Sequence, residues 1–156
     1  MTVGLHSSSS ALLAENISYC IFRTGLTWQA FPAADVREVM PRPQLVCVPH
    51  SPLAFAGLCH VRSEFVPVVN LKRMLNESDM QDEQVLLILE DTDGPWGVLV
   101  DEVIALQRLE VSDAPESFEE DHSSLVVGWG IHDDAVIQIL DHRRLRRLAE
   151  GYAEAG

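Results

Sequence analysis

The sequence predicts an all-β protein with a C-terminal helix. Short apolar runs recur along the 156 residues, and residues that favour turns separate them. There is no alternation of strands with long helical segments, and no repeat of 20–50 residues. Such a pattern is typical of small barrels or a sandwich. About ten strands can close one large barrel or two small ones, and the pattern alone does not decide between them.

The expected strands are rich in β-branched, aromatic and other apolar residues. Asp93-Gly94 and His132-Asp133-Asp134 are the turn signals of the last two hairpins. A short extended piece is expected at 45–48 among four prolines, and 104–111 alternates only weakly. The eight clearer strands are 17–23, 26–31, 58–62, 65–69, 84–90, 96–103, 125–131 and 135–140.

A short helical turn is expected over 36–40, because Asp35 is a suitable N-cap. In this turn Val36 and Val39 share one face, while Glu38 is free to point elsewhere. The prolines that follow exclude regular structure across the connecting loop.

The C-terminal helix is expected over 142–150, with Asp141 as its cap. Leu145, Leu148 and Ala149 fall on one face, which we expect to point inward. The four arginines of the helix are expected to lie mostly toward water: Arg143, Arg144, Arg146 and Arg147.

The stretch 55–75 is the centre of the pattern, because two apolar runs flank a two-residue polar break there. Ser63-Glu64 is the expected turn, which leaves Arg62 on one face of the first strand. Pro67 donates no ladder hydrogen bond, so an edge position or a bulge is expected in the second strand. Residues 70–75 then form a brief helical end. An edge that carries one guanidinium is a candidate docking surface.

The charge is distributed unevenly along the chain. Residues 81–140 hold fifteen Asp and Glu residues against one Arg, a net charge of −14 in a chain whose total is −13. An acidic surface repels phosphate, so no nucleic-acid partner is expected, and most of these carboxylates should form a solvated face. No apolar run approaches the roughly 18 residues that a membrane span needs, so no direct membrane insertion is expected.

The chain is expected to hold one domain, 16–150, between a flexible tail at 1–15 and a short C-terminal tail at 151–156. A domain of this size buries roughly 68–70% of its unfolded surface, so it needs no disulfides. The three cysteines are Cys20, Cys47 and Cys59. They lack the spacing of zinc or redox sites, and we expect small buried hydrophobes in a reducing cytoplasm.

The sequence shows no catalytic pattern. The motifs of α/β-hydrolases, P-loops, dinucleotide sites and zinc proteases are absent. His60 follows Cys59, but adjacent strand residues point to opposite faces and cannot easily share a metal. The cluster at 121–123, Asp-His-Ser, is expected to be a surface loop. We therefore expect no catalytic residue, no metal and no cofactor.

An ordered set of short motifs runs along the chain. The strongest are Pro-Val-Val-x-Leu at 67–71 and Gly-x-Leu-Val-Asp-x-Val at 97–103. The others are Val-x-Glu-Val at 36–39, Val-Pro at 48–49, Gly-Leu at 57–58 before Arg62, Val-Val-Gly at 126–128 and Ile-Leu-Asp at 139–141. This order resembles the CheW family of chemotaxis coupling proteins, from about Ile17 to Leu148.

The resemblance implies two small five-stranded, SH3-like β-barrels that share one core and are closed by the C-terminal helix. It implies a non-catalytic adaptor in bacterial chemotaxis or surface-motility signalling. Such a protein binds the cytoplasmic tip of a chemoreceptor and the regulatory domain of a CheA-type histidine kinase. A cytoplasmic location follows, with recruitment to membrane-associated receptor arrays.

Partner contacts are expected at positions that match the family: Val36, Glu38, Val39, Gly57, Arg62, Val66 and Val68. For Arg62 and Glu38 an intramolecular ion pair is an alternative, and both can hold together. The valines of the expected helical turn are equally compatible with the core. The three family glycines most simply mark bulges or close backbone approach: Gly57, Gly97 and Gly128.

Three residues depart from the family pattern. His60 and Ser63 stand where Asn and Gly are common, and Asn70 stands where Asp is common. Keeping a positive φ at Ser63 would cost about 1 kcal/mol. The sequence therefore indicates a divergent adaptor of a dedicated or accessory pathway. A single-barrel peptide- or ligand-binding module and a small hydrolase stay open as alternatives.

Overall fold

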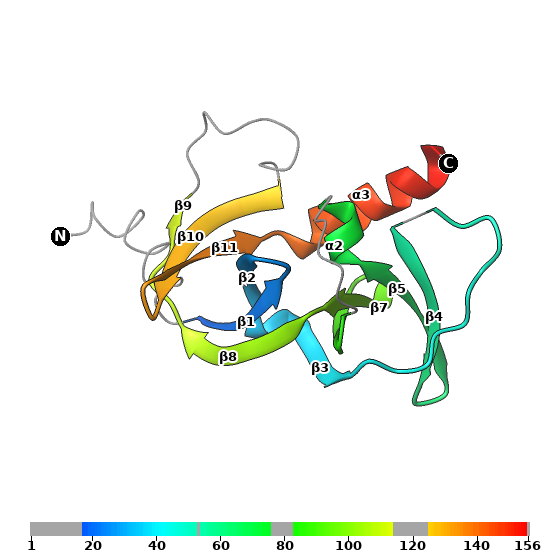
Figure 1. The fold of residues 1–156 in the computed structure, drawn as a ribbon, viewed down its shortest axis with the longest axis horizontal. Helices are drawn as coiled ribbons and strands as arrows, with labels where there is room; N and C mark the ends of the chain where they lie inside the picture. Colours follow the sequence, from blue (N-terminus) through cyan, green and yellow to red (C-terminus); the bar gives the residue numbers. More distant parts are fainter. Residues whose placement is uncertain (1–16, 53, 76–82, 114–124, 156) are drawn as a thin grey trace.

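Two curled β-sheets lie side by side, and one helix extends from the end of the chain (Figure 1). The expected class, all-β with a C-terminal helix, is confirmed. The expected N-terminal tail and the Asp-His-Ser cluster lie outside the described residues. The structure, a computed structural model, describes residues 17–52, 54–75, 83–113 and 125–155.

The first sheet has the strand order β8-β1-β2-β11-β10-β9. Only residues 109–111 join its two outer strands, so its edges lie close together, and Leu109 packs inside with Ile137. The sheet therefore curls into a small barrel. Its strands are β1 (Ser18–Thr24), β2 (Thr27–Pro32), β8 (Glu102–Arg108), β9 (Ser112–Asp113), β10 (Val126–His132) and β11 (Ala135–Leu140).

The second sheet has the strand order β3-β6-β7-β5-β4. Its outer strands are β3 and β4, yet Arg62 after β4 lies 3.4 Å from Glu38 of β3. This sheet therefore also curls back on itself, and the single-barrel alternative is wrong. Its strands are β3 (Val36–Pro41), β4 (Phe55–Val61), β5 (Glu64–Asn70), β6 (Val85–Asp91) and β7 (Gly94–Val100).

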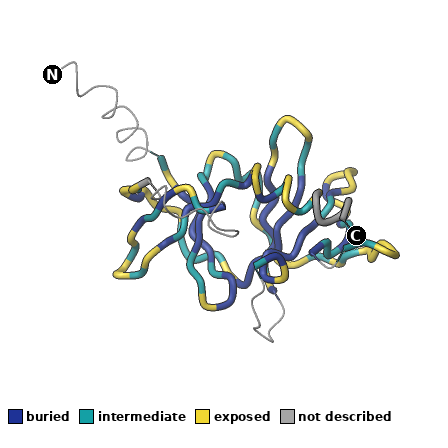
Figure 2. The backbone as a smooth tube through the Cα atoms, turned by 90° about the horizontal axis from the view of Figure 1, so that it is seen from above, coloured by how far each residue is buried: buried dark blue, intermediate teal, exposed yellow. Residues whose placement is uncertain are grey.

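The two barrels share one core, as the resemblance implied. The largest cluster joins Phe22 and Phe31 of the first sheet to Trp96 of the second and Leu145 of the last helix. Smaller clusters fill each barrel separately. Figure 2 shows the buried residues in the strands and most exposed ones in the turns. The helical elements are η1 (Ala33–Asp35), α2 (Leu71–Met74) and α3 (His142–Ala155).

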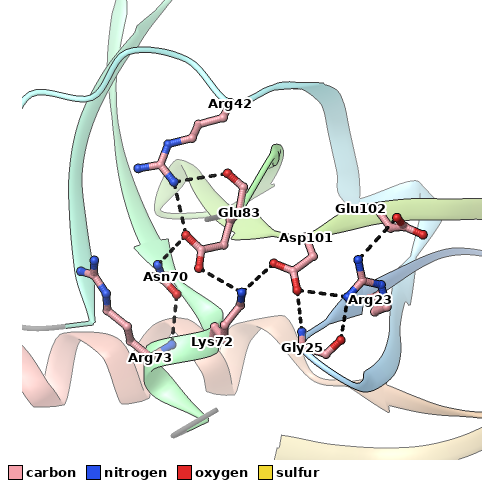
Figure 3. Close-up of polar contacts among 9 residues, drawn as sticks. All are labelled: Arg23, Gly25, Arg42, Asn70, Lys72, Arg73, Glu83, Asp101 and Glu102. Carbon is pink, nitrogen blue, oxygen red and sulfur yellow. Dashed lines mark hydrogen bonds and ion pairs between the residues drawn. The ribbon is translucent and has the colours of Figure 1, made fainter. Parts of the chain in front are cut away.

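A buried group of charges lies where the two sheets meet (Figure 3). Lys72 of α2 is only 3% exposed, and its ammonium lies 2.9 Å from Asp101 Oδ1 and 3.5 Å from Glu83 Oε2. Asp101, between β7 and β8, also accepts a 2.7 Å hydrogen bond from the N–H of Gly25 in the β1–β2 turn. Each buried charge thus has partners that offset its desolvation. Through Asp101, Lys72 of the second barrel is thus linked to the β1–β2 turn of the first barrel.

Asn70 explains one departure from the family pattern. Its Nδ2 donates a 3.0 Å hydrogen bond to Glu83 Oε1, and its Oδ1 accepts one of 3.0 Å from the N–H of Arg73, which caps α2. An ionised aspartate accepts but cannot donate, so only an amide makes both bonds. Asn70 and Glu83 therefore form a matched pair.

Residues 36–40 form strand β3, so the expected helical turn is wrong. The strand pairs with β6 and carries a bulge between Val36 and Glu38. The bulge places Val36 and Met40 toward the core, and this produces an apolar spacing that imitates a helix. Pairing with β6 and the β-branched valines decide the conformation.

The expected strand 96–103 is two strands that belong to different sheets. β7 ends at Val100 and β8 begins at Glu102, with the buried Asp101 between them. The carboxylate of Asp101 holds the crossing point by accepting the hydrogen bond from Gly25. The apolar pattern of β7 continues into β8, so no local signal indicated that the chain passes from one barrel to the other at Asp101.

Helix α3 differs from its expected orientation. Asp141 caps it, as expected, by accepting hydrogen bonds from the N–H groups of the first turn. Leu145 is buried, but Leu148 is exposed. Arg146 lies over the Trp96 ring, with Cζ 5.8 Å from the ring centroid, rather than toward water. An arginine stem can cover apolar surface, so a charged residue takes the inward place predicted for a leucine.

Two of the three cysteines are buried, whereas Cys47 is exposed, contrary to expectation. Burial raises the pKa of the Cys20 thiol to about 11, and it also raises the pKa of Cys59. The cause in both cases is the lost hydration of the thiolate. Cys47 is therefore the accessible thiol of the described residues.

We expect Lys72→Met to lower the free energy of unfolding by about 3 kcal/mol, since two buried carboxylates lose their shared cation. Urea denaturation measures this change. The matched control is Arg73→Met, because Arg73 is the exposed neighbour on the same helix and should cost less than about 1 kcal/mol. Equal losses in the two variants would contradict the role of the buried network.

At about pH 8 we expect one fast-reacting thiol per folded chain and three after denaturation. Cys20→Ala should also remove a pH dependence of stability. The folded pKa of about 11 exceeds the ordinary value of 9.0, so the stability that Cys20 contributes is complete below about pH 9 and is lost as the pH rises toward 11. Thiol titration and urea denaturation measure the two effects, and two fast thiols in the folded protein would contradict the first.

Candidate functional site

The turn between β4 and β5 consists of Arg62 and Ser63, one residue earlier than expected. Both residues have positive φ, 49° and 71°. Paired positive φ values match the twist of a tight hairpin, although glycine or asparagine is the usual choice. Ser63 keeps the conformation of the glycine that the family pattern has here, at a cost of about 1 kcal/mol. Arg62 therefore projects from a turn and not from a strand face.

The Arg62 guanidinium forms an ion pair with Glu38 of β3. Nη1 lies 3.4 Å from Oε1, and Nη2 donates to Oε2 at 3.4 Å. The intramolecular pair considered from the sequence is thus present, but it joins a turn to a strand. The Arg62 side chain remains 67% exposed, whereas that of Glu38 is 23% exposed. A planar guanidinium held at one edge by a carboxylate still presents donors to a partner.

A second arginine supports the same corner of the barrel. Arg37 of β3 lies 3.6 Å from Glu64 at the start of β5, and 3.6 Å from Glu90 near the end of β6. Arg37 and Glu38 therefore both bring β3 close to the β4–β5 turn. The charged side chains of this corner are held before any partner binds.

The two valines of β3 have different environments. Val36 packs against the shared core, whereas Val39 is 45% exposed. The strand bulge separates their directions. Of the two, Val39 is the one at the surface, and alternation along β3 points it to the face opposite to Glu38.

The remaining predicted positions lie in the interior. Val66 and Val68 are buried in the core of the second barrel, so their side chains serve packing in this conformation. Gly57 is also buried, has φ +140°, and lies at a bulge. A Cβ there would lie 2.6 Å from the carbonyl oxygen of Val46, so the glycine permits a close backbone approach.

The other two glycines of the motif also permit close approach. A Cβ at Gly97 would lie 2.8 Å from a methyl group of Leu86. One at Gly128 would lie 2.9 Å from the carbonyl oxygen of Ser112, and a register shift in β10 marks a bulge there. Gly57 and Gly128 thus match the expected bulge and close backbone approach, whereas the close neighbours of Gly97 are side chains.

Phe65 was missed among the candidate surface residues. It is 67% exposed, and its ring centroid lies 4.9 Å from that of His60, which is directly opposite on β4. The run 65–69 was expected as a strand without an exposed aromatic residue being singled out, and period-two alternation places Phe65 on the face opposite to the buried Val66. The pair provides an aromatic surface next to Arg62.

Pro67 lies in an interior strand, since β5 has β4 on one side and β7 on the other. The parallel pairing with β7 covers only Val68 to Asn70 and begins after the proline. On the other side, Leu58, the partner of Pro67, exchanges its backbone hydrogen bonds with Val46. The sheet therefore needs no ladder hydrogen bond from Pro67. The proline is tolerated inside the sheet, and the edge position expected from the sequence is wrong.

The described residues hold no group of three or more His, Cys, Asp or Glu side chains that could bind a metal ion. Among these residues, no helix has the length and apolar content needed to cross a membrane. The corner around Arg62 combines a guanidinium, a carboxylate and an aromatic pair. This combination can bind another protein surface.

Comparisons with known proteins agree with the fold. A crystal structure of the scaffolding protein TtCheW from Thermoanaerobacter tengcongensis superposes with a TM-score of 0.73 at 21% sequence identity, over 80% of this chain and 88% of that one. Protein PilI of Pseudomonas aeruginosa is 28% identical over 92 residues, which are 58% of this chain and 52% of PilI. The match thus spans about half the length of that curated relative. A model of the CheW-like domain matches residues 18–150. The chain therefore belongs to the CheW-like domain family.

Proposed function

We propose that this protein is a non-catalytic adaptor that couples chemoreceptors to a CheA-type histidine kinase, in bacterial chemotaxis or surface-motility signalling. The single observation that carries the proposal is the corner around Arg62. There an exposed guanidinium is paired with Glu38, at the end of the hairpin that carries the His60–Phe65 pair. Membership of the CheW-like domain family supports it.

The corner has the composition of a binding hot spot. Arginine and aromatic residues dominate such sites, and apolar neighbours exclude water from the charged contact. Burial of the exposed Phe65 would supply affinity at roughly 25 cal/mol per Å². Arg62 would set the register by binding a partner carboxylate with two donors. We assign the whole of this corner of the second barrel to partner contact.

The adaptor acts in the cytoplasm and is recruited to receptor arrays at the membrane. Its two partners are the cytoplasmic tip of a receptor and the regulatory domain of the kinase. His60 and Ser63, which depart from the family pattern, lie at this corner. The surface is therefore suited to cognate partners of a dedicated pathway.

We expect Arg62→Glu to weaken binding of the cognate kinase regulatory domain or receptor tip by at least about tenfold. The charge of the contact is reversed, and Glu38 is left without its cation. Co-sedimentation with receptor tips and titration calorimetry with the kinase domain measure the two affinities. Arg108→Glu, on an exposed position of the other barrel, is the matched control.

A charge swap distinguishes partner contact from internal support. Arg62→Glu combined with Glu38→Arg restores an ion pair between the turn and β3. If Arg62 binds the partner, the swap stays defective. Full recovery would show that the pair only holds the barrel together, and wild-type protein that bound neither cognate partner would refute the adaptor function.

A further inference from the structure

Strand β8 forms an open edge of the first sheet (Figure 1). It pairs with β1 on one side, and no strand of the described residues pairs with its other side. Its partner β1 is joined to β2 by the two-residue loop Gly25-Leu26, and the pair Thr24–Thr27 closes this loop. The closing pair of such a loop is hydrogen-bonded, so it determines the direction of every backbone group along β1.

Hydrogen bonding alternates along β1 from the closing pair. Thr24 bonds β2, as does every second residue before it, while the residues between them bond β8. Tyr19 is one of the residues between, and its partner on β8 is Gln107. The neighbours of Gln107 are Leu106 and Arg108, so their N–H and C=O groups point away from β1. Each of the two thus offers a donor and an acceptor to an added strand.

The open side of β8 is accessible to a partner. Leu106 is 69% exposed, and Gln107 and Arg108 are exposed as well. Proteins usually protect a sheet edge with prolines, bulges or charged residues. β8 contains no proline, and its bulge, opposite the step from Ile21 to Phe22, precedes this stretch. The end of β8 is therefore a regular edge at which a strand can be added.

A hollow of about 450 Å³ lies at the end of this edge. Arg108 lines it from β8, and Trp129, Ile131 and Val136 line it from the β10–β11 hairpin. Ile131 and Val136 lie directly opposite each other and are 67% and 56% exposed. A segment that pairs with the end of β8 can therefore place an apolar side chain against these residues.

The charges near the hollow favour a basic segment. Glu110 lines the hollow, and Asp133 and Asp134 are exposed in the turn of the β10–β11 hairpin. These carboxylates outnumber the one guanidinium at the hollow, that of Arg108. The wider region has the same sign, because residues 81–140, which include β8 to β11, carry a net charge of −14. A basic segment is attracted here, and an acidic one is repelled.

We propose that the open edge of β8 binds an extended, basic segment of a partner protein as an added strand. Its backbone bonds Leu106 and Arg108, and one of its apolar side chains enters the hollow. In strand addition the main-chain bonds give affinity and the side-chain pockets give specificity. This surface lies on the first barrel, whereas the Arg62 corner lies on the second. The inference thus goes beyond the proposed adaptor function and does not depend on it.

Amide hydrogen exchange, followed by NMR, tests the open edge in the free protein. The amides of Leu106 and Arg108 should exchange much faster than the amide of Gln107, which bonds β1. Equal protection of the three amides would show that the edge is already covered. Protection that rises with protein concentration would show that a second copy covers it. Either result would overturn the proposal.

The probe for binding is a peptide of about eight residues in which lysine and valine alternate. It should protect the Leu106 and Arg108 amides from exchange and shift the amide resonances of Ile131 and Val136 saturably. One control has glutamate in place of every lysine, and the others carry N-methyl groups on one or the other set of alternate amides. The glutamate peptide, and at least one N-methylated peptide, should bind at least about tenfold more weakly.

Equal binding of all these peptides would overturn the proposal, because neither charge nor backbone bonds would then select the segment. Binding of the lysine peptide without protection of the Leu106 amide would also refute strand addition. The protein that carries Arg62→Glu should bind the lysine peptide as the wild type does. A loss of binding in that variant would place the peptide at the other barrel.

Variants of the edge and of the hollow test the two parts of the surface. Leu106→Pro removes an outward N–H but no bond to β1, and it should abolish binding of the lysine peptide. Ile131→Lys combined with Val136→Lys should weaken binding at least about tenfold, since it removes apolar contact and adds repulsion. The matched control is Val39→Lys combined with Val46→Lys, two exposed valines outside the first sheet.

The lysine double variant of the hollow keeps the test decisive if Leu106→Pro disturbs folding, and thermal melts identify such a disturbance. Both residues of the double variant are exposed, so their replacement leaves the core intact. Unchanged binding in this variant, or an equal loss in its matched control, would refute the proposed site.

Discussion

The fold depends on one buried cation, Lys72, at the place where the two barrels meet (Figure 3). Its two carboxylate partners arrive from different parts of the chain. Glu83 precedes the first strand of the β6–β7 hairpin, and Asp101 stands where the chain leaves the second barrel for the first. In low dielectric an unpaired charge is costly, so each partner must be in place for the others to be stable. The network therefore selects one relative arrangement of the barrels.

Side chains rather than a complete ladder close the second barrel in the described part of the chain. In the second barrel, the contacts of Arg37 and Arg62 bridge the gap between β3 and the β4–β5 hairpin. The same contacts hold the exposed corner that we assign to partner binding. Barrel closure and the proposed surface thus share residues, and a substitution at Arg62 or Glu38 acts on both. This coupling is the reason that a charge swap, and not a single change, separates the two roles.

The sequence predicted most of the strands, the cap at Asp141, and the structural role of Gly57 and Gly128. It misplaced β3, because a bulge between Val36 and Glu38 gives a strand the apolar spacing of a helix. It misplaced the Arg62 turn by one residue, since the turn uses non-glycine residues at positive φ. Of the predicted contact positions, Arg62 and Glu38 lie at the surface corner and Val39 is exposed on the other face of β3, while Val66, Val68 and Gly57 are buried. Phe65 was missed because one exposed residue in an apolar run leaves little trace in the pattern.

By itself, the sequence determined the strand order along the chain, the C-terminal helix and the family, because periodicity, turn residues and ordered motifs are local properties. Only the tertiary structure decided that 96–103 divides between two barrels, that Arg146 covers Trp96, and that Lys72 is buried between two carboxylates. Each of these depends on residues that are distant in the chain. Burial and electrostatic pairing act between such residues only after the chain has folded, so no local pattern of residues could specify them.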